Sequence, residues 1–394
     1  MTSQVSPRRR WSRMEEKKKS PFLRLLTFLL TAVLLLGSVL LIFNWRKLNF
    51  DFIRRYFSYR SLARNESGQT EPFLYAGGVK SSFLQLGDDL LVCSSSGVRL
   101  YSAGGGAFID QPSALAQPFA STVGSTALVY DAGGNDLFVY RDREQVFAYT
   151  AETGRSILSA SLSAQGRLTV VTQGSGVKGA VTVYDADFQP SFSLNISSRF
   201  VTDAILSPDG QTLALATSGQ TGGSFDSQVS FYSLGQAQPD AVCSLGNNTI
   251  LQLNWASEPL RVLGENALAF VSSDGALTGS YSYDRRVLKG FSLEGDTCAL
   301  LLGKYRAGST ADLVTVNSKG EETASLPMEE QILSLSSAGR YLSVLTADGL
   351  TIYSDDLEPY HVTSGLPGVR RALQRGDGSV ILISEETARL YLPD

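Results

Sequence analysis

The sequence has few of the residues on which catalytic and metal sites most often depend. Its 394 residues include one histidine and three cysteines. A single imidazole, that of His361, cannot build a multi-histidine metal site, and no GxSxG segment accompanies it to supply a serine nucleophile. We therefore predict that His361 is a surface residue of an outer strand, and we expect no catalytic residue, no metal and no cofactor.

Disulfides are not expected either. Cys93, Cys243 and Cys298 lie in or beside separate apolar runs, and an odd count leaves at least one cysteine unpaired. We predict small buried thiols that pack as hydrophobic residues. Only Trp255 lies beyond residue 64, which disfavours a quinone or sugar site built from repeated tryptophans.

The acidic residues indicate turns rather than chemistry. Adjacent acids occur at residues 88–89, 329–330, 355–356 and 385–386. Neighbouring residues of a strand point to opposite faces, whereas a glycosidase needs two carboxyl groups about 5 to 9.5 Å apart across one site. The Asp-Gly pairs that begin at Asp209, Asp274, Asp348 and Asp377 lack the alternating series of a calcium loop, and we interpret them as tight turns.

Charge is distributed unevenly along the chain. Residues 1–64 contain fourteen Lys and Arg and three acids, whereas the remainder contains twenty bases and thirty-five acids. An acidic remainder should repel nucleic acid, because nucleic-acid binding depends on Lys and Arg that neutralise phosphates. No nucleic-acid partner is expected.

A long uncharged run predicts one membrane span. Residues 25–43 contain no charge, and nineteen helical residues extend about 28 Å, close to the roughly 30 Å hydrocarbon core of a bilayer. The run exceeds the apolar region of a signal peptide, so we predict an uncleaved transmembrane helix at residues 22–43. Eight bases precede it and six follow it, which favours a cytoplasmic N-terminus in a bacterial cell membrane. Residues 1–21 would be a disordered basic tail, and residues 44–70 a juxtamembrane helix and linker that either lies on the membrane or forms a stalk.

A turn-and-strand pattern recurs from residue 83 to the C-terminus, as in LSPDGQTLALAT at 206–217. Eight units carry it, at residues 84–101, 122–140, 162–184, 206–232, 253–283, 293–316, 335–353 and 373–391. Their average spacing of 39 residues is near that of a four-stranded propeller blade. The second strands are apolar at successive positions, as in a sheet covered on both faces. We predict an all-β, eight-bladed propeller over residues 71–394.

Two details of this propeller are less regular. The fifth unit fits poorly, with residues 266–273 as its expected second strand, and a miscount there would leave seven blades. The last unit ends after its third strand. We expect residues 71–75 to supply the fourth strand and so to join the two ends of the ring.

The anchor, the FLYAGG segment at 73–78, LVYDAGGNDLFVY at 128–140 and SPDGQTLALAT at 207–217 resemble an uncharacterised bacterial family of membrane-anchored propellers, a domain of unknown function. The likeness covers roughly residues 22–390. These motifs are structural, so the resemblance implies the fold and the membrane tether and assigns no catalytic residue.

Extended loops suggest where the propeller binds. They join the second and third strands at residues 173–179, 218–228 and 303–312, and such loops share one face of a propeller. Their large or cationic side chains are the candidate binding residues Lys178, Phe225, Lys304, Tyr305 and Arg306. We expect a non-catalytic module that binds an envelope protein or a cell-wall component outside the cell. The alternatives are an envelope hydrolase with unrecognised carboxylates, or a sensor that would need a cytoplasmic partner.

Overall fold

The computed structural model describes residues 26, 28–33, 35, 51–60, 62–78 and 80–393. The chain divides into two units, Met1–Arg54 and Arg55–Asp394. In the first unit, residues 26, 28–33 and 35 are helical, and the rest of the predicted span lies outside the described residues. Within the described residues, no helix has both the length and the apolar character needed to cross a bilayer.

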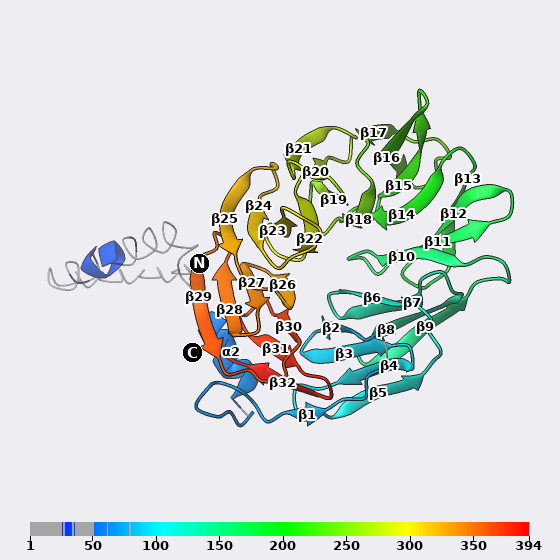
Figure 1. Ribbon diagram of the computed structural model, residues 1–394. Coiled ribbons are helices and arrows are strands. Elements are labelled where there is room, and N and C mark those ends of the chain that lie inside the picture. Colours follow the sequence, from blue (N-terminus) through cyan, green and yellow to red (C-terminus); the bar gives the residue numbers. More distant parts are fainter. Residues whose placement is uncertain are drawn as a thin grey trace, which may run out of the picture. The chain divides into compact units, whose positions relative to one another are not determined.

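The second unit is a ring of eight antiparallel sheets with four strands each (Figure 1). Blades 1 to 4 are β2–β5 (Ser82–Leu86, Asp89–Ser94, Gly97–Tyr101, Ala107–Pro112), β6–β9 (Pro118–Val123, Thr126–Asp131, Asp136–Arg141, Glu144–Thr150), β10–β13 (Ile157–Leu162, Leu168–Gly174, Val177–Tyr184, Pro190–Ile196) and β14–β17 (Phe200–Leu206, Thr212–Thr221, Ser224–Ser233, Ala241–Gly246). Blades 5 to 7 are β18–β21 (Ile250–Asn254, Leu260–Gly264, Ala267–Val271, Leu277–Ser282), β22–β25 (Val287–Ser292, Cys298–Gly303, Ala311–Val316, Glu322–Met328) and β26–β29 (Ser334–Ala338, Tyr341–Leu345, Gly349–Ser354, Pro359–Ser364). The predicted eight-bladed propeller is confirmed.

Blade 8 joins the two ends of the ring. It contains β30 (Arg371–Gln374), β31 (Val380–Ile383), β32 (Thr387–Tyr391) and, as its outermost strand, β1 (Phe73–Leu74). Phe73 pairs with Ala388, and the Thr70 amide donates to the Leu390 carbonyl at 2.9 Å. The prediction that residues 71–75 contain the missing fourth strand is confirmed.

The cores lie between neighbouring blades. Every residue of β3 and of β23 is buried, as the uninterrupted apolar runs predict. Leu128 and Val139 of blade 2 pack with Ile157 and Leu168 of blade 3. Since burial of one such side chain contributes about 1.5 to 3 kcal/mol, each blade is stabilised mainly by its neighbours.

The second strand of blade 5 was predicted wrongly. Residues 266–273 contain β20, which is the third strand, and the second strand is β19. β19 contains a charged residue, Arg261, which interrupts the apolar run expected of a buried strand. The buried Arg261 guanidinium donates to the carbonyls of Leu293 and Gly295, so the strand stays buried despite its charge.

The cysteines and turns follow the sequence predictions. Cys93, Cys243 and Cys298 are buried and free. His361 lies in β29, the outermost strand of blade 7. The Asp-Gly pairs lie in turns, and the aspartate side chain closes the turn at three of them, Asp209, Asp274 and Asp377. The Asp209 carboxylate, for example, accepts from the Ser207 hydroxyl at 2.5 Å and the Gln211 amide at 3.1 Å.

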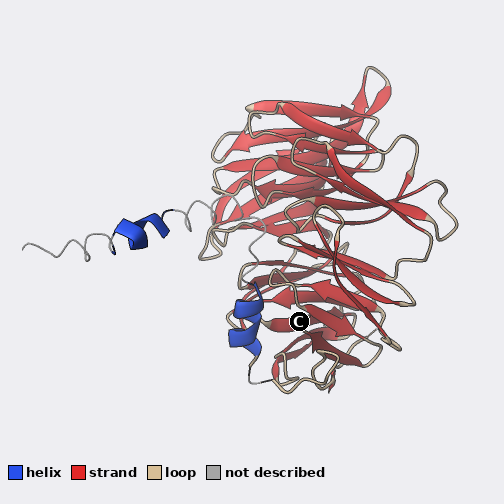
Figure 2. Cartoon of the chain, turned by 90° about the vertical axis from the view of Figure 1, so that its left-hand side faces the viewer, coloured by secondary structure: helices blue, strands red, loops and turns tan. Residues whose placement is uncertain are grey.

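The antiparallel order gives the ring two different faces. The loop face contains the turns between the second and third strands of each blade and the connections from one blade to the next. The helix face contains the turns between the first and second strands and between the third and fourth strands. The helix α2 (Asp51–Tyr59) contacts the latter, where Arg55 donates to the Asp377 carbonyl at 2.6 Å and to the Tyr360 hydroxyl at 3.1 Å. Figure 2 shows α2 on one side of the ring.

The two faces also differ in charge. The turns of the helix face contain fifteen acids and five bases, whereas the turns and connections of the loop face contain eight of each. Most of the acidic character of the propeller therefore belongs to the face that α2 contacts.

Candidate binding face

All five predicted binding residues lie on the loop face, but the structure does not bring them together. Lys178 is the second residue of β12 in blade 3, and Phe225 is the second residue of β16 in blade 4. Lys304, Tyr305 and Arg306 follow β23 in blade 6. In blades 3 and 4 the expected loops are instead continuations of the strands. β15 and β16 pair as far as Thr221 and Ser224. Strand pairing there needs only backbone hydrogen bonds, so the hairpin continues although its residues are polar.

Lys178 is already engaged by its neighbours. Its ammonium donates to the Ser198 carbonyl at 2.9 Å and lies 4.9 Å from the centre of the Phe200 ring. Because Phe200 begins the first strand of blade 4, these contacts tie blade 3 to blade 4. Lys178 has less freedom to bind a partner than its sequence position suggested.

The long hairpin of blade 4 is braced close to its tip, where Phe225 is exposed. Arg199 lies 3.3 Å from the Asp226 carboxylate, which also accepts hydrogen bonds from Thr221, Gln228 and Ser244. Burial alone would raise the pKa of Asp226, but the hydrogen bonds and the Arg199 charge outweigh burial and lower this pKa. The hairpin therefore holds Phe225, which is 41% exposed, in a fixed place.

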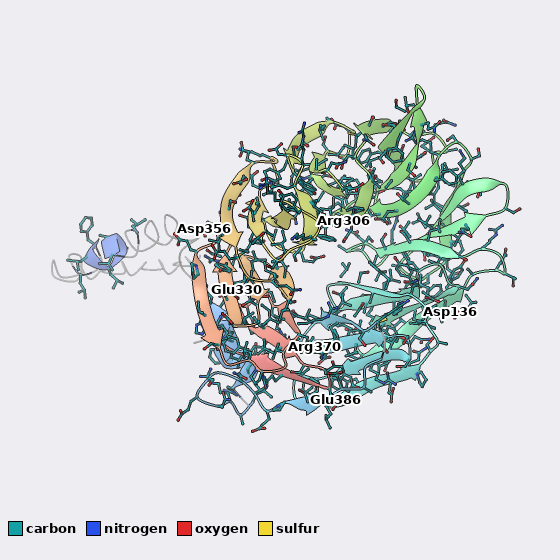
Figure 3. The ribbon with its side chains drawn as sticks, in the orientation of Figure 1. Asp136, Arg306, Glu330, Asp356, Arg370 and Glu386 are labelled. Atoms are coloured by element: carbon teal, nitrogen blue, oxygen red, sulfur yellow. The ribbon has the colours of Figure 1, made fainter. Side chains whose placement is uncertain are left out.

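The loop of blade 6, residues 304–310, borders a hollow of about 560 Å³. Lys289 fixes the loop by donating to the carbonyls of Gly308 at 2.6 Å and Thr310 at 3.2 Å. Arg306 lines the hollow together with Gln331 and Ile332 of the connection to blade 7. Among the described residues Arg306 has no ion pair, and Tyr305 beside it is 65% exposed. Figure 3 labels Arg306 and, in blade 8, Arg370 on the ring.

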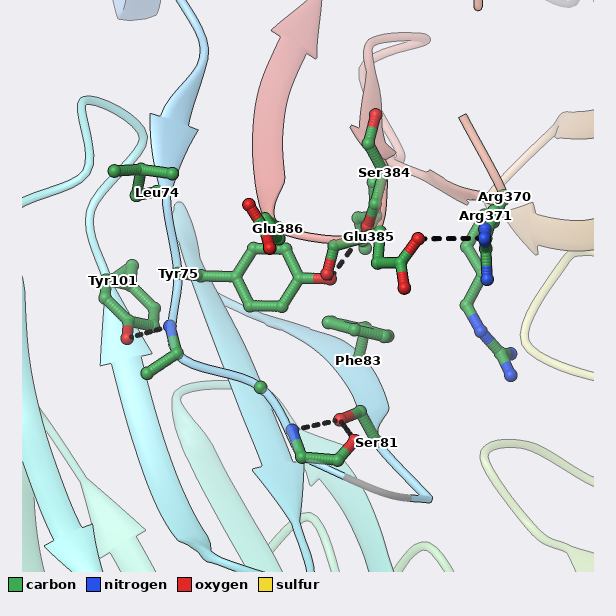
Figure 4. A pocket seen from close by; sticks show the side chains of 14 residues that line it. Leu74, Tyr75, Ser81, Phe83, Tyr101, Arg370, Arg371, Ser384, Glu385 and Glu386 are labelled. Atoms are coloured by element: carbon green, nitrogen blue, oxygen red, sulfur yellow. Dashed lines mark hydrogen bonds and ion pairs between the residues drawn. The ribbon is translucent and has the colours of Figure 1, made fainter. Parts of the chain in front are cut away.

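A second hollow, the seam groove, lies between blades 8 and 1 and has a volume of about 890 Å³. Its lining residues come from the start of blade 1, from β4 and from the loop-face ends of β30 to β32: residues 74–78, Ser81, Phe83, Tyr101, Arg370, Arg371 and residues 383–386 (Figure 4). Both ends of the ring therefore contribute to it. None of the five predicted binding residues lies here.

Tyr75 fixes the groove from the inside. Its hydroxyl lies 2.7 Å from the Ser384 carbonyl and 2.9 Å from the Glu385 carbonyl, and its ring meets Phe83 edge-to-face at 5.3 Å. Burial, aided by the nearby Glu385 charge, raises the pKa of Tyr75, so the hydroxyl stays protonated and able to donate. Sequence reasoning missed this site because its two halves are almost 300 residues apart. The available signal was the FLYAGG segment, which combines the closing strand with an exposed glycine turn.

No described cluster points to a reaction. No three His, Cys, Asp or Glu side chains of the described residues are placed to hold a metal ion. Glu385 is paired with Arg370 at 2.9 Å. The adjacent acids Asp88 and Asp89 are not simple solvated turns, since each binds a different arginine, Arg375 and Arg143 respectively, at 2.5 and 2.7 Å.

Comparisons with known proteins agree with this architecture. The model of a "Family of unknown function (DUF5711)" matches residues 57–357. The C-terminal WD40 domain of Sif2 is similar in structure, with a TM-score of 0.53, 11% identity, and coverage of 83% of this chain and 97% of that domain. A chain of the mitotic checkpoint complex gives a TM-score of 0.48, 14% identity, and coverage of 84% and 94%. At 11% identity the likeness to the Sif2 domain shows the fold alone. No curated protein sequence matches.

Proposed function

Since this chain belongs to the family of unknown function DUF5711, we propose that its propeller is a non-catalytic scaffold that binds a partner protein with the loop face. One observation carries the proposal. Both hollows and all five candidate residues lie on the loop face, while Arg55 of α2 binds the helix face. The loop face is thus the one that α2 does not contact, and it is the face that we expect to bind a partner.

We further propose that residues 22–43 tether the propeller to a bacterial cell membrane. The partner of the loop face would then be an envelope protein or a cell-wall component. Lipid headgroups are often anionic and would repel the acidic helix face, so we expect that face to bind no lipid.

A photocrosslinking experiment in the cell tests the proposal. A photoreactive amino acid replaces Tyr305, which is exposed on the loop face of blade 6. The matched control replaces Ser318, which is exposed in the β24–β25 turn of the same blade but on the helix face. We expect a discrete crosslinked partner from position 305 and none from position 318. Equal capture from both positions, or capture only from 318, would contradict a loop-face scaffold.

A further inference from the structure

We propose that the seam groove binds an extended peptide segment in which one basic and one acidic side chain flank an apolar residue. The proposal deepens the function proposed above, because it names the kind of partner segment that the loop face would take. The volume of the groove, about 890 Å³, lies within the range of about 300 to 1,000 Å³ that is typical of ligand sites.

Aromatic rings supply the apolar centre of this site. Tyr75 and Phe83 lie in contact with an angle of 83° between their rings. The Tyr75 hydroxyl is fixed by two backbone carbonyls, so its ring loses little freedom when a ligand binds. Phe83 is half-buried and lines the groove with Tyr75. An apolar side chain of the ligand would pack against these two rings.

The charges around the rings decide what flanks that side chain. Four charged residues line the groove, and two of them, Arg370 and Glu385, neutralise each other. Arg371 and Glu386 are exposed, and neither has an ion pair among the described residues. In Figure 4 Glu386 lies beside the Tyr75 ring and Arg371 lies beyond Phe83, with the Glu385 side chain between the two charges. The site therefore offers one free positive and one free negative charge on either side of an apolar centre.

This charge pattern disfavours simpler ligands. An anionic ligand would be attracted by Arg371 and repelled by Glu386, and a cationic ligand would meet the reverse. A segment with both charges satisfies both residues. A peptide also suits the open wall of the groove, because Gly77 and Gly78 leave the backbone there uncovered. A Cβ atom at Gly78 would lie 3.1 Å from the hydroxyls of Ser94 and Ser96.

Capped fluorescent tripeptides test this specificity on the full-length protein by fluorescence anisotropy. We expect Lys-Phe-Glu to bind about fivefold more tightly than Lys-Phe-Lys or Glu-Phe-Glu, the ratio that follows from an exposed ion pair worth up to about 1 kcal/mol. Replacement of phenylalanine by glycine in the mixed peptide should also weaken binding. Equal affinity for the three charged peptides, or no binding of any of them, would overturn the proposal.

Charge reversals separate recognition from a structural effect. Arg371→Glu should shift the preference to Lys-Phe-Lys, and Glu386→Lys should shift it to Glu-Phe-Glu. The double variant should prefer the mixed peptide again. Arg306→Glu in the hollow of blade 6 is the matched control and should leave the preference unchanged. If both reversals lower the affinity for all three peptides by the same factor, the groove does not distinguish the charges of its ligand. Peptide binding needs no cellular partner, so its failure would leave the crosslinking result standing on its own.

Discussion

The Arg375 guanidinium lies 2.5 Å from a carboxylate oxygen of Asp88, and the two side chains have opposite environments. The arginine side chain is 3% exposed, whereas the aspartate side chain is 72% exposed. Arg375 belongs to the β30–β31 turn of blade 8 and Asp88 to the β2–β3 turn of blade 1, so the pair crosses the seam of the ring. The guanidinium also lies 5.4 Å from the centre of the Tyr59 ring in α2. One side chain therefore joins both ends of the ring and the helix.

Because of this difference in burial, the two partners should differ in their contribution to stability. Arg375→Ala removes a buried group and its contact with Tyr59, and we expect the free energy of unfolding to fall by about 2 to 4 kcal/mol. Asp88→Ala removes an exposed carboxylate and should cost less than about 1 kcal/mol. Urea titration followed by circular dichroism measures both. Equal losses would show that the ion pair itself, rather than the buried arginine, stabilises the seam.

A second prediction concerns the contact between the closing strand β1 and Gly105, which lies in the β4–β5 turn. Gly105 has φ +85°, and a Cβ atom there would lie 2.3 Å from the Cβ atom of Phe73 in β1. Gly105→Ala should therefore destabilise the propeller by more than about 2 kcal/mol, since it adds backbone strain and displaces the closing strand. The neighbouring Gly104 has open space around its Cα, and Gly104→Ala is the control that should cost less than about 1 kcal/mol. Similar melting temperatures for the two variants would contradict this account.

The blade 6 loop carries the third prediction. Replacement of residues 304–310 by Asn-Gly should leave β23 and β24 paired, because two residues suffice for a hairpin turn. It should remove Arg306 together with the hollow that this residue lines, and reduce partner capture by a photoreactive residue at position 225. Circular dichroism should show that the ring still folds. Undiminished capture would mean that the partner does not use this part of the loop face.

Features that depend on residues close together in the sequence could be predicted. The spacing of the blades is one of them, because the second and third strands are buried on both faces and their apolar runs repeat in the sequence, as in β3 and β23. The closure was also predictable, since the last unit lacks a strand that the segment before the first unit could supply.

Features that depend on distant partners were missed. Arg261 disguises a buried strand because the carbonyls that satisfy it lie in the following blade. Tyr75 and Arg371 become neighbours of one groove only after the ring closes. The strand extensions in blade 4 were interpreted as loops because backbone pairing leaves no apolar pattern. The binding roles of Lys178, Phe225, Lys304, Tyr305 and Arg306 stay predictions.

The pH dependence of stability tests blade 4, because the pKa values of two of its aspartates are shifted in opposite directions. Asp203 accepts from the Ser159 hydroxyl at 2.6 Å and from the Leu253 amide at 3.1 Å, so it links the first strands of blades 3, 4 and 5. Burial raises its pKa above the ordinary 3.8, although these hydrogen bonds oppose the effect. Asp226, near the hairpin, has a lowered pKa instead.

The raised pKa of Asp203 means that the folded state holds its proton at a pH where the unfolded state has lost it. The stability that Asp203 provides is therefore complete below about pH 4 and is lost as the pH rises through the raised value. Relative to Asp203→Asn, the wild type should become less stable as the pH rises above about 4 in urea titrations. Asp226→Asn should give the opposite sign, since the stability from the ionised Asp226 is present above about pH 4 and is lost as the pH falls through its lowered pKa. A stability difference that does not vary with pH for Asp203→Asn would show that the pKa of Asp203 is the same in the folded and unfolded states, and that its hydrogen bonds balance the effect of burial.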